Sequence, residues 1–299
     1  MNTVEESLVW LHSDLSRIDF KAVLQDMAGR LRQQPTELRS LFVPRVLRIR
    51  GEILAACYFK PLAGGVATLA KIRSTGGWEQ AAVDLMSRQA ADLQNRGIAQ
   101  VQAVVPEGDA ATADLLARAG WNHLTHVQHQ WLDCRPYETA PAHAPPTAAQ
   151  LWRPANTLAR SRFARLIEGT FQQTLDCPAL NGLRDSSQVL EGFLEGRSWR
   201  SVDRLWEVLQ YRGQLAGCLI MQAHGQELLE LTYLGLLPQA RGQRLGQQLI
   251  VRAQQHCQQR KVQALVAAVD EQNWPALQLY RQLGFEPQQR FEVWLYKAS

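Results

Sequence analysis

The chain has 299 residues, of which 46% are hydrophobic and 20% are charged, so it can bury a core and is not expected to be disordered. At about 150 residues per domain, this length predicts two domains. A net charge of +4, from 32 Lys and Arg against 28 Asp and Glu spread along the chain, is too weak and diffuse to predict a nucleic-acid or membrane surface.

The cysteines and the start of the chain indicate the expected environment. The five cysteines lie far apart, their number is odd and none forms a Cys-x-x-Cys pair, which argues against a complete disulfide framework or a metal knuckle. The opening residues, MNTVEESLVWLHSDLS, lack the basic and apolar segments of a signal peptide. No apolar run approaches the roughly 20 residues that span a bilayer. We therefore expect a reduced, cytoplasmic protein without a metal or a membrane anchor.

In chain order, each half shows helical segments, a hairpin with a further strand, a helix, a strand, a second helix and a last strand. Arg-Gly lies between two β-rich runs in RGEILAAC, 50–57, and again in RGQLAGCL, 212–219. This pattern predicts two hairpins, in which Gly51 and Gly213 supply the positive φ of the turn.

The two halves are separated by TAPAHAPPTAAQ, 139–150, which is rich in Pro and Ala, lacks periodicity and is typical of a linker. The predicted domains are therefore residues 1–138 and 151–299. In the second half we expect helices near 158–172, 186–195, 242–259 and 273–283, and strands near 204–211, 215–222, 228–237, 262–269 and 290–297.

A weak internal repeat relates the halves. At a constant offset of 164 residues, Glu107 matches Glu271 and Gly120 matches Gly284, and further identities fall in the same order in the same elements. Around the hairpins the offset is 162, which indicates a small insertion. We interpret the chain as a tandem duplication.

The segment TYLGLLPQARGQRLGQQLI, 232–250, has the features of an anion site. A strand breaks at Pro238, a turn containing Gly242 and Gly246 follows, and a helix begins. The first N–H groups of a helix lack intrahelical acceptors and carry the positive end of its dipole, so they bind anions such as phosphates. Arg241 and Arg244 add positive charge beside this turn.

This segment, together with NWPALQLYRQLGFE at 273–286, resembles the GCN5-related N-acetyltransferase (GNAT) superfamily, whose pyrophosphate turn reads [Gln/Arg]-x-x-Gly-x-[Gly/Ala]. Arg241 and Gly246 fill the first and last positions, whereas Arg244 stands where glycine is usual. The resemblance implies a mixed α/β (α+β) fold of two tandem GNAT-like domains. Each would have a mostly antiparallel sheet flanked by helices.

The resemblance also implies which residues bind acetyl-CoA. The strand ending before Pro238 would splay from its neighbour, freeing the backbone of Leu236 and Leu237 for the acetyl and pantetheine groups. The pyrophosphate would lie on the turn, and Asn273 would contact the pantetheine arm or simply cap its helix. Arg244 is either a surface charge or a contact to a cofactor phosphate. The turn residues implied in cofactor binding are Arg241, Gly242, Gln243, Arg244, Leu245 and Gly246.

The same resemblance implies the catalytic residues of a direct acetyl transfer to an amine in a ternary complex. Tyr280 would protonate the leaving thiolate, and Glu230 matches a position where some members carry the general base. Glu230 is equally consistent with a charged strand residue that faces solvent. Tyr280 could also be a core aromatic, but its place in the motif favours the catalytic role. The acceptor could be a small molecule, a peptide or a protein amine, and Asp176, Asn181 and Asp185 could bind it or serve only in turns and caps.

The first half lacks the site positions, since Leu116 stands at the place of Tyr280 and Trp78 at that of Gly242. We therefore expect one coenzyme A per chain, bound by the second half. Two alternatives stay open: a non-catalytic acyl-CoA sensor, and a tandem acetyltransferase of the mycothiol synthase type.

Overall fold

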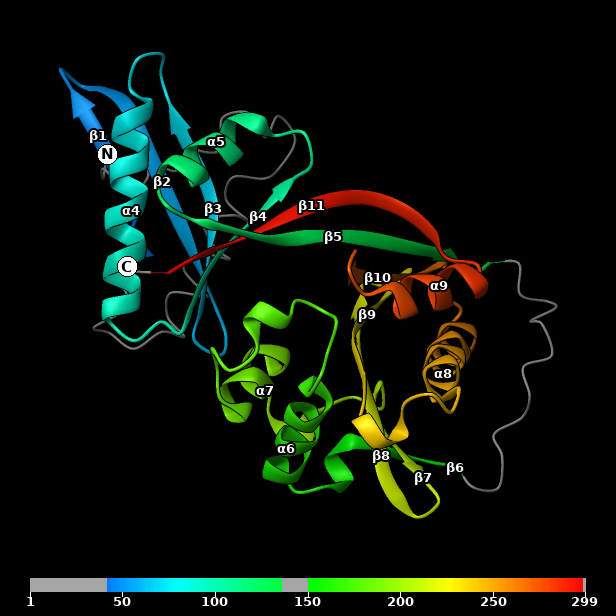
Figure 1. Cartoon of the computed structure of the whole chain (residues 1–299). Helices are drawn as coiled ribbons and strands as arrows, with labels where there is room; N and C mark the ends of the chain where they lie inside the picture. The colour runs from blue at the N-terminus through cyan, green and yellow to red at the C-terminus, as the bar shows by residue number, and fades with distance from the viewer. Residues whose placement is uncertain (1–41, 136–149, 298–299) are drawn as a thin grey trace. The chain divides into compact units, whose positions relative to one another are not determined.

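The computed structural model describes residues 42–135 and 150–297 (Figure 1). The chain divides into two compact units, one formed by residues 1–124 and 291–299 and the other by residues 125–290. The predicted linker, 139–150, lies outside the described residues except for Gln150, and so do the helical segments expected before residue 42. None of the helices in the described part of the chain is long and apolar enough to cross a membrane.

The first unit has a sheet in the order β1-β2-β3-β4-β11, in which only β3 and β4 are parallel. The amphipathic helix α4 packs its apolar face on this sheet, and the two form one core with α5. Its elements are β1 (Arg45–Ile49), β2 (Glu52–Leu62), β3 (Val66–Ser74), α4 (Glu79–Asn95), β4 (Gln100–Pro106), α5 (Ala110–Arg118) and the end of β11 (Glu286–Tyr296).

The second unit has a sheet in the order β5-β10-β9-β8-β7-β6, in which only β9 and β10 are parallel. Helices α6 and α7 lie on one side of β8 and β9, and α8 lies on the other (Figure 1). Its elements are β5 (Asn122–Asp133), β6 (Gln150–Pro154), α6 (Arg160–Phe171), α7 (Ser186–Leu194), β7 (Trp206–Tyr211), β8 (Gln214–His224), β9 (Leu228–Leu236), α8 (Leu245–Arg260), β10 (Ala264–Asp270) and α9 (Trp274–Gln282).

Each half of the sequence gives its last strand to the other unit. Residues Val127–Asp133 of β5 pair with β10 of the second unit, and Phe291–Tyr296 of β11 pair with β4 of the first. Trp294 is buried in the core of the first unit and Leu132 in that of the second. Since β4 and β10 are repeat copies, either last strand offers them an equivalent antiparallel partner. The elements predicted within the described residues are present, and the exchange of the last strands was not foreseen.

Both units contain the same two irregularities. An unpaired residue, Ala70 in β3 and Thr232 in β9, forms a bulge at the repeat-equivalent place. After it the parallel pair opens, because β3 pairs with β4 only through Leu69 and β9 pairs with β10 only through Leu231. The predicted hairpin turns are also confirmed, since Arg-Gly takes positive φ in both.

Candidate active site

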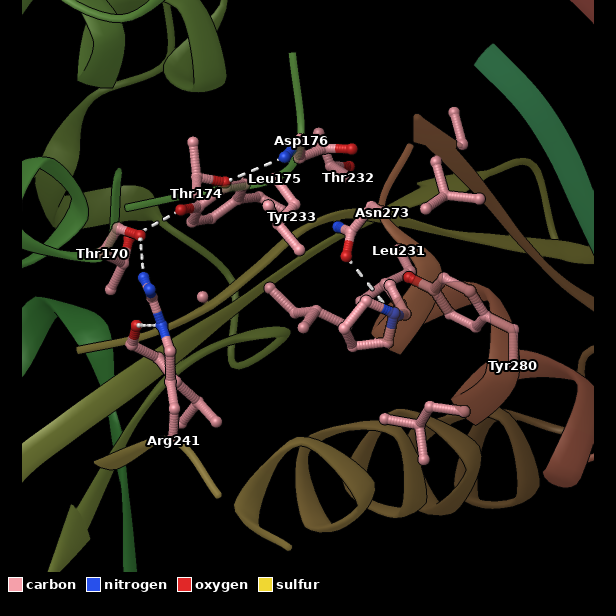
Figure 2. A pocket seen from close by; sticks show the side chains of 18 of the residues that line it. Thr170, Thr174, Leu175, Asp176, Leu231, Thr232, Tyr233, Arg241, Asn273 and Tyr280 are labelled. Carbon is pink, nitrogen blue, oxygen red and sulfur yellow. Dashed lines mark hydrogen bonds between the residues drawn. The ribbon is translucent and has the colours of Figure 1, made fainter. Parts of the chain in front are cut away.

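A cavity of about 290 Å³ lies where β9 separates from β10. Figure 2 shows its walls, formed by β9, by the start of α9 and by the segment that follows α6. Four of the predicted site residues line it: Leu236, Arg241, Asn273 and Tyr280.

The opening leaves one edge of β9 without a strand partner. The N–H of Leu237 donates to the carbonyl of Ala216 at 2.9 Å, and its carbonyl accepts from Ala240 at 2.8 Å, so the backbone of Leu237 is occupied. Antiparallel strands alternate bonded and non-bonded pairs. Leu236, one residue earlier, therefore directs its N–H and carbonyl away from β8, and Leu234 does the same. The free edge thus consists of Leu234 and the N–H of Leu236, since the carbonyl of Leu236 accepts from Arg241.

Arg241 fixes the end of α6 to the end of β9. Its guanidinium donates to the carbonyls of Thr170, Gln172 and Gln173 at 3.0, 2.7 and 3.0 Å, and to that of Leu236 at 3.2 Å. The last carbonyls of a helix have no intrahelical donor, and a cation beside them is favourable. The first position of the turn motif therefore holds the cavity wall together through its side chain.

The turn that follows presents backbone N–H groups. Gly242 has φ +74°, and Arg244, the N-cap of α8, takes the left-handed conformation at φ 58° and ψ 14°. A non-glycine residue there stores roughly 1 kcal/mol of strain or more. The N–H groups of Gln243, Arg244, Leu245 and Gly246 have no acceptor among the described residues. This is the arrangement expected of an anion site at a helix start.

The side chains around the turn leave its front open. Arg244 is exposed and forms no ion pair with any described residue. A Cβ atom added to Gly246 would lie 3.4 Å from Leu279 of α9, an ordinary van der Waals contact, so packing against α9 does not by itself require glycine here. Asn273 caps α9 by accepting from the N–H of Ala276 at 3.4 Å.

Tyr280 is 5% exposed and directs its hydroxyl toward Leu231 at the inner end of the cavity (Figure 2). Its ring packs edge-on against Phe285, at 4.9 Å between centroids. Burial raises the pKa of Tyr280, and the nearby charge of Asp176 raises it further. The phenol therefore stays protonated at neutral pH, as a proton donor must.

A family model described as the acetyltransferase (GNAT) family matches residues 179–285, which include α8, the turn and α9. Residues 179–285 therefore carry a GNAT domain. Mycothiol acetyltransferase from Thermobifida fusca (strain YX) is 26% identical over 263 residues, which cover 79% of this chain and 77% of that protein.

Two solved structures share the fold. A GCN5-related N-acetyltransferase from Sphaerobacter thermophilus has a TM-score of 0.61 at 14% identity, over 98% of this chain and 91% of that one. A tandem GNAT protein from the clavulanic acid biosynthesis pathway, solved without AcCoA, has a TM-score of 0.57 at 17% identity, over 99% and 95%. The predicted fold class, two tandem GNAT-like domains of mixed α/β structure, is confirmed.

Glu230 lies apart from this GNAT cavity. It is not among the residues of the cavity wall, its side chain is 37% exposed, and its carboxylate contacts the imidazole of His224 at 2.6 Å. The assignment of Glu230 as base stays a prediction that the geometry does not favour.

The three residues considered for acceptor binding, Asp176, Asn181 and Asp185, lie in different places. Asp176 lines the main cavity, whereas Asn181 lines a neighbouring cavity of about 310 Å³. Asp185 caps α7 in a reciprocal capping box with Gln188 and is occupied in that way. Gln173 lines both cavities and so marks where they adjoin.

Sequence reasoning missed a hydroxyl pair in the cavity wall. Tyr233 and Thr170 form a hydrogen bond of 2.6 Å, which joins β9 to α6. A Cβ atom at Gly235 would lie 2.6 Å from both hydroxyl oxygens, so this close approach requires glycine. The sequence signal was the glycine itself, near the end of an otherwise leucine-rich strand.

Proposed function

We propose that the protein transfers an acetyl group from acetyl-CoA to an amine acceptor, directly and within a ternary complex. One observation carries the proposal: the open edge of β9, the buried Tyr280 and Arg241, the first residue of the turn before α8, line one cavity. Acetyltransfer is the chemistry of the GNAT family, whose model matches residues 179–285. The five free cysteines are consistent with the reducing cytoplasmic setting that we infer.

The donor would lie along the free edge of β9. Hydrogen bonds of a peptide-like pantetheine arm to Leu234 and Leu236 would extend the sheet into the opening, with Asn273 on the other side. The N–H groups of residues 243–246 would hold the pyrophosphate, and the exposed Arg244 would add a charged contact. Leu237 and the side chain of Arg241 would support this arrangement without touching the donor, because their polar groups have other partners.

The reaction forms a C–N bond and breaks a C–S bond. A neutral amine attacks the acetyl carbon, whose oxygen is polarised by an N–H of the β9 edge. The thiolate of coenzyme A departs and takes the proton of Tyr280. The ammonium form of the acceptor loses two protons in all, of which one ends on the thiol and one in solvent.

A Tyr280→Phe variant tests the role of the acid. Loss of a positioned proton donor lowers rates by about 10²- to 10⁴-fold, so we expect kcat to fall at least 100-fold. The affinity for acetyl-CoA should change less than twofold, because the ring and its packing on Phe285 are kept. Thiol release in a steady-state assay and calorimetric titration with acetyl-CoA measure the two quantities.

Two results would count against this assignment. Unchanged turnover in Tyr280→Phe would show that Tyr280 is not the general acid. Acetyl-CoA binding without thiol release, in the wild-type protein and across a broad amine panel, would instead favour the acyl-CoA sensor.

A mycothiol-related acceptor is a second candidate. The similarity to a mycothiol acetyltransferase extends over 79% of the chain and so includes residues of both units. In a competition assay, preference for such an acceptor over simple amines by at least tenfold in kcat/KM would support this candidate, and equal rates would oppose it.

A further inference from the structure

We propose that Asp176 is the group that binds the ammonium of the acceptor and removes its proton. This inference rests on the proposed acetyl transfer, and it gives the base a different residue from Glu230. Asp176 precedes the left-handed Cys177 in the segment after α6, where neither a helix nor a strand determines its direction.

Its position relative to the cavity is the first argument. Asp176 is the sole carboxylate among the residues that line the cavity, and it is accessible from the surface although the cavity wall partly desolvates it. Figure 2 shows Asn273 between Asp176 and Tyr280.

The second argument is the way in which the carboxylate is held. One oxygen of Asp176 accepts from the backbone N–H of Asp270 at 2.9 Å. In return, Asp270 accepts from the N–H of Cys177 at 2.8 Å. These reciprocal bonds tie the loop to the end of β10 and fix the orientation of the Asp176 carboxylate, which is the pre-organisation that a base requires.

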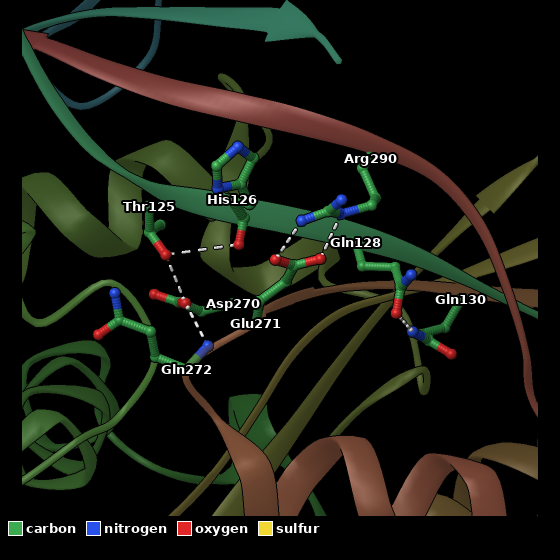
Figure 3. Close-up of polar contacts among 8 residues, drawn as sticks. All are labelled: Thr125, His126, Gln128, Gln130, Asp270, Glu271, Gln272 and Arg290. Atoms are coloured by element: carbon green, nitrogen blue, oxygen red, sulfur yellow. Dashed lines mark hydrogen bonds and ion pairs between the residues drawn. The ribbon is translucent and has the colours of Figure 1, made fainter. Parts of the chain in front are cut away.

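Asp270 is itself fully buried and saturated with donors. Figure 3 shows its other oxygen, which accepts from the hydroxyl of Thr125 at 2.6 Å and from the N–H of Gln272 at 2.8 Å. With both oxygens in use and no exposure, Asp270 has a positioning role. Asp176 is left as the carboxylate that an acceptor can reach.

The charges that face Asp176 favour a cationic ligand. Desolvation by the cavity wall raises the pKa of Asp176; the negative charge of Asp270 on β10 raises it further, whereas hydrogen bonds from the Asp270 N–H and Asn273 lower it. The other titratable groups that face it are Tyr280 from α9, Tyr233 from β9 and the adjacent thiol of Cys177, all with raised pKa values. An alkylammonium ion is the ligand that neutralises this cluster.

In the proposed step, the ammonium donates one proton to Asp176 and becomes the neutral amine that attacks the acetyl carbon. Asp176 then returns this proton to solvent through the open cavity. The second proton leaves the nitrogen as the amide forms, and it replaces the one that Tyr280 gives to the thiolate. No oxidant or further reactant is required.

Paired variants test the assignment. In Asp176→Asn the amide oxygen can still accept from the N–H of Asp270, so the loop should keep its place. We expect kcat/KM for the amine to fall at least 100-fold at pH 7, with acetyl-CoA affinity within twofold. The deficit should shrink toward pH 10, where a larger fraction of the amine is already neutral. Glu230→Gln, the matched control, should keep kcat/KM within threefold.

Other outcomes would overturn the proposal. A large loss of kcat/KM in Glu230→Gln, with normal turnover in Asp176→Asn, would show that Glu230 is the general base. A deficit in Asp176→Asn that is constant with pH, or that comes with lost acetyl-CoA binding, would make Asp176 structural.

A binding experiment separates this proposal from the proposed function. A primary alkylamine is titrated calorimetrically into the coenzyme A complex of the wild-type protein and of Asp176→Asn. Binding that the substitution weakens at least tenfold supports the ammonium site, even where the wild-type protein turns over no amine. Binding that the substitution leaves unchanged overturns it.

Discussion

The turns before α4 and α8 occupy equivalent places in the two units, but their backbone N–H groups have different partners. In the first unit, the N–H of Gly77 donates to the carboxylate of Glu79 at 3.1 Å, so the turn carries its own anion. In the second unit, Gln243 stands at the repeat position of Glu79, and the N–H groups of residues 243–246 have no acceptor among the described residues. The first unit thus has a carboxylate beside its helix start, whereas the second unit has a neutral amide there.

The fold around the two turns is otherwise conserved within the chain. The first unit keeps the bulge, the opening between its parallel strands and a cavity of about 400 Å³ beside it. Ile72, Ala111 and Leu115 line that cavity, at the repeat positions of Leu234, Pro275 and Leu279. The first unit has therefore kept an opening at this place but lines it with different polar residues, Arg73, Ser74 and Thr112.

A buried ion cluster marks a second difference. Glu207 is 5% exposed and accepts from Arg252 through both oxygens, at 2.7 Å each, and contacts His256 at 2.8 Å. The repeat positions of Glu207 and His256 in the first unit hold Arg45 and Asp92, an exposed pair at 3.6 Å with the signs reversed.

The largest effect is expected from a substitution that disrupts this ion cluster. Glu207→Gln leaves Arg252 without its counter-ion in a largely buried place, so the free energy of unfolding should fall by about 3 kcal/mol. Asp92→Asn removes a solvent-exposed pair and should change it by less than about 1 kcal/mol. Urea unfolding of the two variants measures both values, and equal losses would contradict the comparison.

The same cluster predicts a pH dependence. Burial alone would raise the pKa of Glu207, but the hydrogen bonds and charges of Arg252 and His256 outweigh it and lower the pKa. A lowered pKa in the folded state stabilises the fold above the unfolded value of about 4.3, and this contribution is lost as the pH falls through the folded value. The stability difference between wild type and Glu207→Gln should therefore shrink below about pH 4.

A further variant places a carboxylate in the turn before α8, as Glu79 does in the turn before α4, and so tests the comparison of the two turns. Gln243 stands at the repeat position of Glu79, so Gln243→Glu should place an anion among the free N–H groups and weaken acetyl-CoA binding about tenfold, or 1.4 kcal/mol. Gln243→Ala is the neutral control and should keep the affinity within threefold. Calorimetric titration with acetyl-CoA measures both affinities. Equal affinities in the two variants would contradict the proposal that the N–H groups of this turn bind the pyrophosphate.

The smallest expected effect concerns Arg244. Glycine relieves the left-handed strain of this residue but increases the entropy of the unfolded chain, so Arg244→Gly should change stability by less than about 1 kcal/mol. Loss of one exposed phosphate contact should weaken acetyl-CoA binding by roughly threefold. A large gain in affinity would show that Arg244 obstructs the site, and it would favour the acyl-CoA sensor.

Local patterns in the sequence predicted the elements of the second half because periodicity and turn residues are local properties. The left-handed backbone of Arg244 was not predicted, although this residue stands where the motif usually has glycine. The strand exchange was not predictable, because β4 and β10 accept equivalent partners and only the connection of the chain decides between them. The separation of Glu230 from the cavity follows from the bulge at Thr232, which changes the direction of side chains along β9.

The central claim is that the chain holds one acetyl-CoA site, at the turn before α8. Calorimetric titration of the full chain with acetyl-CoA tests it most directly. We predict one site per chain, with affinity reduced by Gln243→Glu and unaffected by Glu79→Gln in the first unit. Two equivalent sites, or a site that responds to Glu79→Gln and not to Gln243→Glu, would contradict the claim.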